Sequence, residues 1–139
     1  MLLHLPFGGT VDLPFSVYSI SFHVAANGLS QGQLNGAALA SDVDAVVPPA
    51  LAAAIDQSCA GVATPSQQCQ AALLLLDTDH DQRISAAELR ASNLVKGALA
   101  PDVKLFDVHG KFAPDGAAAV KDALSLGFGF TAVHARITR

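Results

Sequence analysis

Apolar and polar residues alternate through the first third of the chain, which is typical of a β-strand. Within residues 15–26, four apolar side chains fall on one face: Tyr18, Ile20, Phe22 and Val24. Asn27 and Gly28 follow, and this dipeptide suits the positive φ angles of a tight hairpin turn. The return segment near residues 29–38 is polar and contains glycine, so we expect a weak edge strand there.

The end of the chain alternates in the same way. Its apolar residues share one face: Leu124, Leu126, Phe128 and Phe130. Gly127 and Gly129 take the other face, where a bulge or a close backbone approach is expected. Because the first and last strands are the most apolar, we expect them to pair at the centre of a sheet. Residues 103–108 predict a shorter strand, and residues 113–116 a turn.

The middle of the chain carries helix signals instead. Ser41 is expected to cap a helical turn, which Pro48 and Pro49 stop or kink before a short helix continues to Cys59. A second helix is expected from Thr64, as its cap, to Leu76.

A third helix is expected to begin at Ser85, which forms a capping box with Glu88. Gly97 and Pro101 are expected to close this helix. Together the elements predict an α+β fold, in which an antiparallel sheet of N- and C-terminal strands packs on a helical layer. With 139 residues we expect a single domain, residues 1–139, made of a β-hairpin (1–40), helices (41–100) and C-terminal strands (101–139).

Several acidic side chains gather between the second and third predicted helices. Three aspartates alternate at Asp77, Asp79 and Asp81, and Glu88 follows on the next helix. Alternation directs the three carboxylates to one centre, and calcium prefers six to eight hard oxygen ligands. This order of helix, acidic loop and capped helix resembles the EF-hand family.

The resemblance implies a Ca²⁺ site in loop 77–88, with ligands from Asp77, Asp79, Asp81, Arg83, Ser85 and Glu88. Arg83 would offer its backbone carbonyl, Ser85 would act through a water, and Glu88 would bind through both carboxylate oxygens. Ile84 would pack into the core. The family has glycine where this chain has Gln82, which costs on the order of 1 kcal/mol and predicts modest affinity. The alternative is a solvated acidic turn.

Other metal sites have weaker support. Zinc is disfavoured because His80 occupies a non-ligand position of the loop and the remaining ligands are oxygens. A second, degenerate calcium site could use Asp107, Asp115 and Asp122, but these lack the alternation and the closing glutamate. A plain loop is the alternative there.

The two cysteines, Cys59 and Cys69, each fall near the end of a predicted helix and face the same short connection. They are either two buried free thiols or a disulfide, and their placement favours the disulfide. A bridge over a loop of this length stabilises by about 3 kcal/mol in the chain-entropy model. It would also indicate an oxidising, extracytoplasmic compartment.

Composition narrows the classes of function. The acidic loop accounts for the whole excess of 12 acidic over 8 basic residues, and Lys and Arg form no basic patch, which argues against nucleic acid and anionic membranes. No apolar run reaches the ~20 residues of a transmembrane segment. No nucleophile, base and acid share a motif, so we expect no enzyme.

The alanine-rich composition and the ending LSLGFGFTAV resemble extracytoplasmic bacterial proteins of unassigned role, including lipoproteins. We therefore expect a module that calcium stabilises, structural or adhesive, within a larger protein and with an unknown protein or surface partner. The alternative is a calcium-responsive switch that binds a partner. A sensor typically exposes a methionine-rich groove, and this chain has one methionine.

Overall fold

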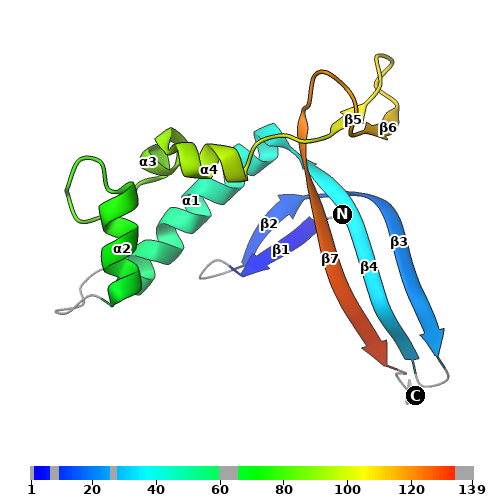
Figure 1. Ribbon diagram of the computed structural model, residues 1–139, viewed down its shortest axis with the longest axis horizontal. Helices are drawn as coiled ribbons and strands as arrows, with labels where there is room; N and C mark the ends of the chain where they lie inside the picture. Colours follow the sequence, from blue (N-terminus) through cyan, green and yellow to red (C-terminus); the bar gives the residue numbers. More distant parts are fainter. Residues whose placement is uncertain (1, 7–9, 26–27, 60–65, 134–139) are drawn as a thin grey trace. The chain divides into compact units, whose positions relative to one another are not determined.

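The computed structural model describes residues 2–6, 10–25, 28–59 and 66–133. The chain divides into two compact units. Phe15–Ala38 and the residues from Pro101 onward form the first, the sheet unit; Leu2–Pro14 and Leu39–Ala100 form the second, the helical unit. Helices and antiparallel strands are both present (Figure 1), so the predicted α+β class is confirmed. The single domain and the packing of the sheet on a helical layer stay predictions.

The sheet unit contains a three-stranded antiparallel sheet of β3 (Ser16–Ala25), β4 (Gly28–Leu39) and β7 (Ala123–Val133). The predicted first and last strands are therefore confirmed. Their predicted pairing is wrong, because the strand order is β3-β4-β7 and β4 lies between them. The polar, glycine-bearing return strand is central in this sheet.

Two aromatic rings explain why glycine suits the central strand. A Cβ atom on Gly36 would lie 2.3 Å from Cζ of Phe15, and one on Gly32 would lie 2.5 Å from Cε2 of Phe130. The rings cover the backbone of β4, and a side chain at either glycine would displace them. The glycines that indicated an edge strand instead allow aromatic rings to lie over the sheet centre.

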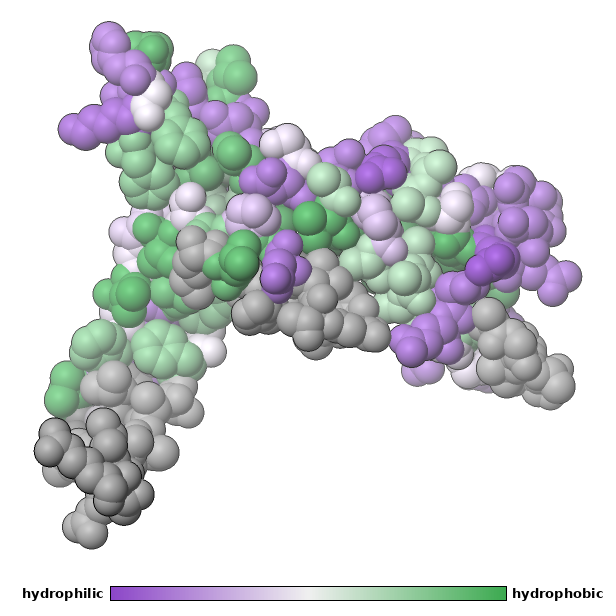
Figure 2. Space-filling model, turned by 180° about the vertical axis from the view of Figure 1, so that it is seen from behind, coloured by the Kyte–Doolittle hydropathy of each residue, from purple (hydrophilic) through white to green (hydrophobic). Residues whose placement is uncertain are grey.

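The apolar face of β3 is exposed to solvent. Tyr18, Ile20, Phe22 and Val24 are each between 43% and 68% exposed. Register shifts at Val17/Ser19 and Ser21/His23 interrupt the pairing of β3 with β4. Seen from behind, hydrophobic residues gather along the sheet strands (Figure 2).

A short hairpin completes the sheet unit. β5 (Lys104–Phe106) falls within the predicted strand, and it pairs antiparallel with β6 (Phe112–Asp115). The predicted turn at residues 113–116 is wrong in part, because most of it belongs to β6. The rings of Phe106 and Phe112 pack edge to face with centroids 6.0 Å apart.

The helical unit begins with a hairpin of β1 (Leu2–Pro6) and β2 (Thr10–Pro14), which we did not predict. Its helices are α1 (Ala40–Cys59), α2 (Gln67–Leu76), α3 (Ala86–Ala91) and α4 (Asn93–Ala98). Ala52 of α1, Ile84 and Leu89 of α3 form its buried core. Across the described parts of the chain, no helix combines the length and apolarity needed to cross a bilayer.

We predicted that Pro48 and Pro49 stop or kink a helical turn. Helix α1 runs without interruption through both prolines, so the stop is wrong. Proline has no N–H, and the carbonyl of Asp44 therefore receives no bond from Pro48. Nη2 of Arg90 donates to this carbonyl at 2.8 Å, and Nε of Arg90 donates to the Asp44 carboxylate at 3.1 Å. A side chain from α3 thus replaces the missing helical hydrogen bond, while Pro48 itself is buried.

Three helix boundaries differ from those predicted. α1 begins at Ala40, so Ser41 lies inside its first turn instead of capping it. α2 is capped by Ser66, whose Oγ accepts a bond from the Cys69 N–H at 3.2 Å; the predicted cap, Thr64, lies outside the described residues. The predicted third helix is two short helices, α3 and α4, which meet at Ser92.

The predicted disulfide is confirmed. Cys59 and Cys69 are bonded, with their Cα atoms 5.6 Å apart. The bond ties the last residue of α1 to the first turn of α2. Both ends of α2 are therefore fixed, one by the disulfide and the other by the core beneath the acidic loop.

Candidate metal centre

Three carboxylates converge in the loop between α2 and α3. Each of Asp77, Asp79 and Asp81 offers an oxygen, and these oxygens lie within 4.8 Å of one another. Asp77 ends α2 and is buried, whereas Asp79 and Asp81 are exposed. The convergence predicted from the alternating spacing is confirmed, and the group could hold a metal ion.

Each aspartate also holds the loop backbone. Oδ2 of Asp77 accepts the Gln82 N–H at 2.9 Å, and Oδ1 of Asp79 accepts the Asp81 N–H at 3.2 Å. Oδ1 of Asp81 accepts the Arg83 N–H at 2.8 Å. The backbone of the loop therefore folds back toward its own carboxylates, and their oxygens come close together.

The other oxygen of Asp77 has no such partner. Asp77 is 8% exposed, and its Oδ1 makes no hydrogen bond to any described residue. Burying a charged oxygen without a partner costs several kcal/mol in general, so such an oxygen calls for a cation or a donor. Because the Asp79 and Asp81 oxygens lie close by, the residues present fit a cation bound by oxygen.

The backbone at Gln82 and His80 is left-handed, with φ angles of 68° and 61°. We predicted strain at Gln82 because the EF-hand family has glycine there. Its positive φ is the conformation on which that prediction depends, and the energetic cost stays a prediction. His80 is exposed and does not join the carboxylate group.

Glu88 has a different set of partners. Its Oε1 accepts the Thr78 N–H at 2.6 Å, and its Oε2 accepts the Ser85 N–H at 2.8 Å. Backbone bonds from Ser85 and then Thr78 lower the pKa of the Glu88 carboxyl from 4.5 to about 2, against the effect of burial. Glu88 lies outside the group of three aspartates, so its role as a ligand stays a prediction.

The predicted capping box is confirmed. The Ser85 Oγ accepts the Glu88 N–H at 3.2 Å and donates to Glu88 Oε2 at 2.9 Å. Ser85 therefore starts α3, and its action through a water stays a prediction. The same holds for the Arg83 carbonyl as a ligand.

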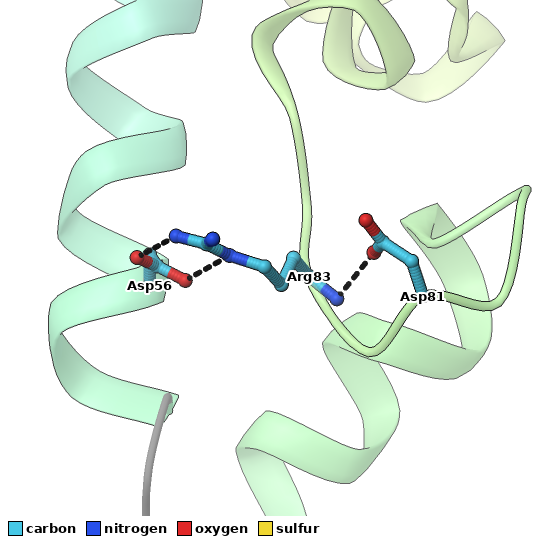
Figure 3. Close-up of polar contacts among 3 residues, drawn as sticks. All are labelled: Asp56, Asp81 and Arg83. Atoms are coloured by element: carbon cyan, nitrogen blue, oxygen red, sulfur yellow. Dashed lines mark hydrogen bonds and ion pairs between the residues drawn. The ribbon is translucent and has the colours of Figure 1, made fainter.

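Two contacts attach the loop to α1. Ile84 is 4% exposed and packs with Ala52 of α1, which confirms the predicted anchoring in the core. The Arg83 guanidinium binds the Asp56 carboxylate of α1, with Nε–Oδ1 at 3.0 Å and Nη2–Oδ2 at 2.7 Å (Figure 3). Sequence reasoning missed this pair, because complementary charges 27 positions apart give no local pattern.

The aspartates considered for a second site serve the backbone instead. Asp107 accepts bonds from His109 and Lys111, Asp115 from Ala117, and Asp122 from Leu105. In the parts of the chain that the structure describes, they form no group able to hold a metal. Of the two alternatives for this segment, a plain loop therefore describes the surroundings of Asp107 better than a second calcium site.

No protein-family model, curated protein or solved structure matches this chain.

Proposed function

We propose that this chain is a calcium-binding module in which the ion mainly stabilises the helical unit. The observation that carries the proposal is the buried Oδ1 of Asp77, which lacks a partner among the described residues and lies beside two further carboxylates. A bound cation would neutralise three like charges held close together. Hard oxygen donors in an irregular loop suit Ca²⁺ better than zinc.

The proposed ligands are the carboxylates of Asp77, Asp79 and Asp81, the Arg83 carbonyl and Glu88, with Ser85 acting through a water. Support for a structural role comes from how firmly the loop is attached. Ile84 lies in the core, and the disulfide fixes the far end of α2. A rigidly held loop favours stabilisation over a large change of shape.

The disulfide also supports an extracytoplasmic location, since such bonds persist in oxidising compartments. Calcium-binding modules outside the cytoplasm typically have Kd values of about 10⁻⁴ to 10⁻³ M. We propose an affinity in this range, because Gln82 holds the position of the usual glycine at a φ of 68°. The chain would then serve as a structural or adhesive part of a larger protein.

Isothermal titration calorimetry tests the proposal. The protein should bind one calcium, and Asp77→Asn should weaken binding at least ten-fold, because it removes the buried charge. Asp115→Asn is the matched control. The Asp115 carboxylate is exposed, accepts the Ala117 N–H and lies outside the group of three aspartates, so the calcium affinity of this variant should equal that of the parent. The proposal is wrong if the parent protein gives no heat with calcium up to ~10 mM, ten times the weakest Kd of this class.

A second candidate is a calcium-responsive switch. Exposed leucines of the helical unit favour it, since Leu74 is 91% exposed and Leu75 is 64% exposed on α2. In a switch, these leucines would contribute to the apolar surface that a partner protein contacts. Calcium should then increase the fluorescence of a dye that binds apolar surface, whereas a structural ion should leave it unchanged.

A further inference from the structure

Arg83 places a cation in the middle of the acidic loop. Its backbone N–H donates to Oδ1 of Asp81, one of the converging carboxylates, while its side chain points away toward α1 (Figure 3). There the guanidinium meets both oxygens of Asp56, at 3.0 and 2.7 Å. One residue therefore joins the carboxylate cluster through its backbone and a helix through its side chain.

Asp56, Asp81 and Arg83 line the same hollow, a space of about 330 Å³ between α1 and the loop. The arginine side chain is flexible, and its planar guanidinium pairs readily with a nearby carboxylate. A calcium ion and a guanidinium would compete for the oxygens of Asp81. What holds Arg83 therefore affects whether Asp81 is free to bind an ion.

We propose that Asp56 is a positioning residue for the ion site, because it binds the Arg83 guanidinium and keeps that cation away from the Asp81 carboxylate. This inference rests on the proposed calcium function. Asp56 itself would not touch the ion. It acts through Arg83, whose backbone carbonyl stays available to the loop.

The electrostatics agree with this geometry. The hydrogen bond to Asp56 is the main cause that raises the pKa of the Arg83 guanidinium, and the charge of Asp81 adds a smaller contribution in the same direction. The bond to Arg83 lowers the pKa of the Asp56 carboxyl in turn. The Arg83 side chain is 66% exposed and that of Asp56 is 31% exposed, so the effect on calcium affinity should be a modest one, about five-fold.

Three variants separate this role from a general charge effect: Asp56→Asn, Arg83→Gln and the two combined. Calcium dissociation constants are measured by calorimetry. Asp56→Asn should raise Kd about five-fold, because it frees Arg83 to pair with Asp81. Arg83→Gln keeps the backbone groups and removes the cation that competes for Asp81, so its Kd should fall below that of the parent. In the Arg83→Gln background, Asp56→Asn should leave the calcium Kd unchanged.

Additive effects would overturn the proposal. If Asp56 acted only as a distant negative charge, its removal would raise Kd by the same factor whether or not Arg83 is present. A Kd for Asp56→Asn equal to that of the parent also overturns it. Asp56→Glu, which keeps the charge, should bind calcium like the parent; a five-fold weaker Kd there contradicts the idea.

A second ion pair on the same helix is the matched control. Arg90 binds Asp44 of α1 but does not line the hollow. Asp44→Asn should lower the melting temperature and leave the calcium Kd within two-fold of that of the parent. A five-fold higher Kd for Asp44→Asn would contradict the proposal, because it would mean that losing any ion pair of α1 weakens calcium binding through lower stability. If the parent protein binds no calcium, the proposed function fails; if it binds and only the variant pattern is wrong, this inference fails alone.

Discussion

Single residues of the acidic loop set its conformation. Gln82 has a φ angle of 68°, in the left-handed region that glycine adopts without a steric cost. A residue with a Cβ loses about 1 kcal/mol there, and part of that loss is offset because glycine is more flexible when unfolded. Gln82 therefore stores strain beside the carboxylate group.

Gln82→Gly should relieve this strain. We expect the free energy of unfolding to rise by ~0.5–1 kcal/mol, measured by urea denaturation in the presence of a chelator. Gln82→Ala is the matched control, since it removes the same side chain but keeps the Cβ and should give no gain. Equal stabilities of the glycine and alanine variants would contradict the strain.

The Glu88 carboxyl should make the stability of the fold depend on pH. Its pKa is lowered from 4.5 to about 2 by hydrogen bonds from Ser85 and Thr78. A lowered pKa in the folded state means that Glu88 stabilises the fold above pH ~4.5 and loses this contribution as the pH falls toward 2. NMR titration with a chelator present should place the Glu88 midpoint near 2. A midpoint near 4.5 would show that these hydrogen bonds are absent in solution.

The spacing of residues along the chain was enough to predict much of this site. The convergence of the aspartates and the Ser85–Glu88 capping box depend on neighbours within one loop, so local geometry fixes them. The burial of Ile84 was predicted from its position in the EF-hand pattern, although it depends on packing against Ala52 of α1. The pair of Arg83 and Asp56 could not be predicted, because it depends on how α1 packs against the loop.

At the scale of elements, α1 shows how a neighbouring helix can repair a proline. Arg90 donates to the Asp44 carbonyl at 2.8 Å, the position that the N–H of residue 48 fills in an ordinary helix. The sequence predicted a stop or a kink at Pro48 and Pro49, because the lost hydrogen bond was weighed without the distant donor. Distant partners were also missing from the prediction for β4. Its glycines indicated an edge strand because the aromatic rings that cover them come from other parts of the chain.

A double-mutant cycle measures this repair. Arg90→Ala should lower the free energy of unfolding by ~1 kcal/mol, since it removes a charge-assisted bond to a helix carbonyl. In a Pro48→Ala background, residue 48 regains its N–H, and the same change should cost less. Urea denaturation of the four proteins gives the coupling. Identical costs in the two backgrounds would mean that Arg90 acts only through the Asp44 carboxylate.

At the scale of the whole molecule, the two compact units should respond differently to calcium. The carboxylate group lies entirely in the helical unit, between α2 and α3. If calcium binds only the folded state, a free calcium concentration of ten times Kd adds ~1.4 kcal/mol to the free energy of unfolding. Amide hydrogen exchange should therefore slow around residues 73–94 when calcium is added and barely change in β3, β4 and β7.

Magnesium at the same concentration is the control for this measurement, since it binds flexible oxygen sites less readily. Slower exchange in the strands as well would show that the ion couples the two units. Faster exchange along α2, together with new dye binding, would favour the switch over the structural role.

The rings over Gly32 and Gly36 also bear on how this protein can change during evolution. Each glycine and the ring above it fill one space, with 2.3 Å to Phe15 and 2.5 Å to Phe130 from the missing Cβ atoms. A larger residue at Gly32 would be tolerated only together with a smaller one at position 130, whereas a Cβ at Gly36 would also lie 2.5 Å from the backbone oxygen of Ser16. Positions 32 and 130 should therefore vary as a pair among descendants of this chain, and position 36 should stay glycine whichever residue stands at position 15.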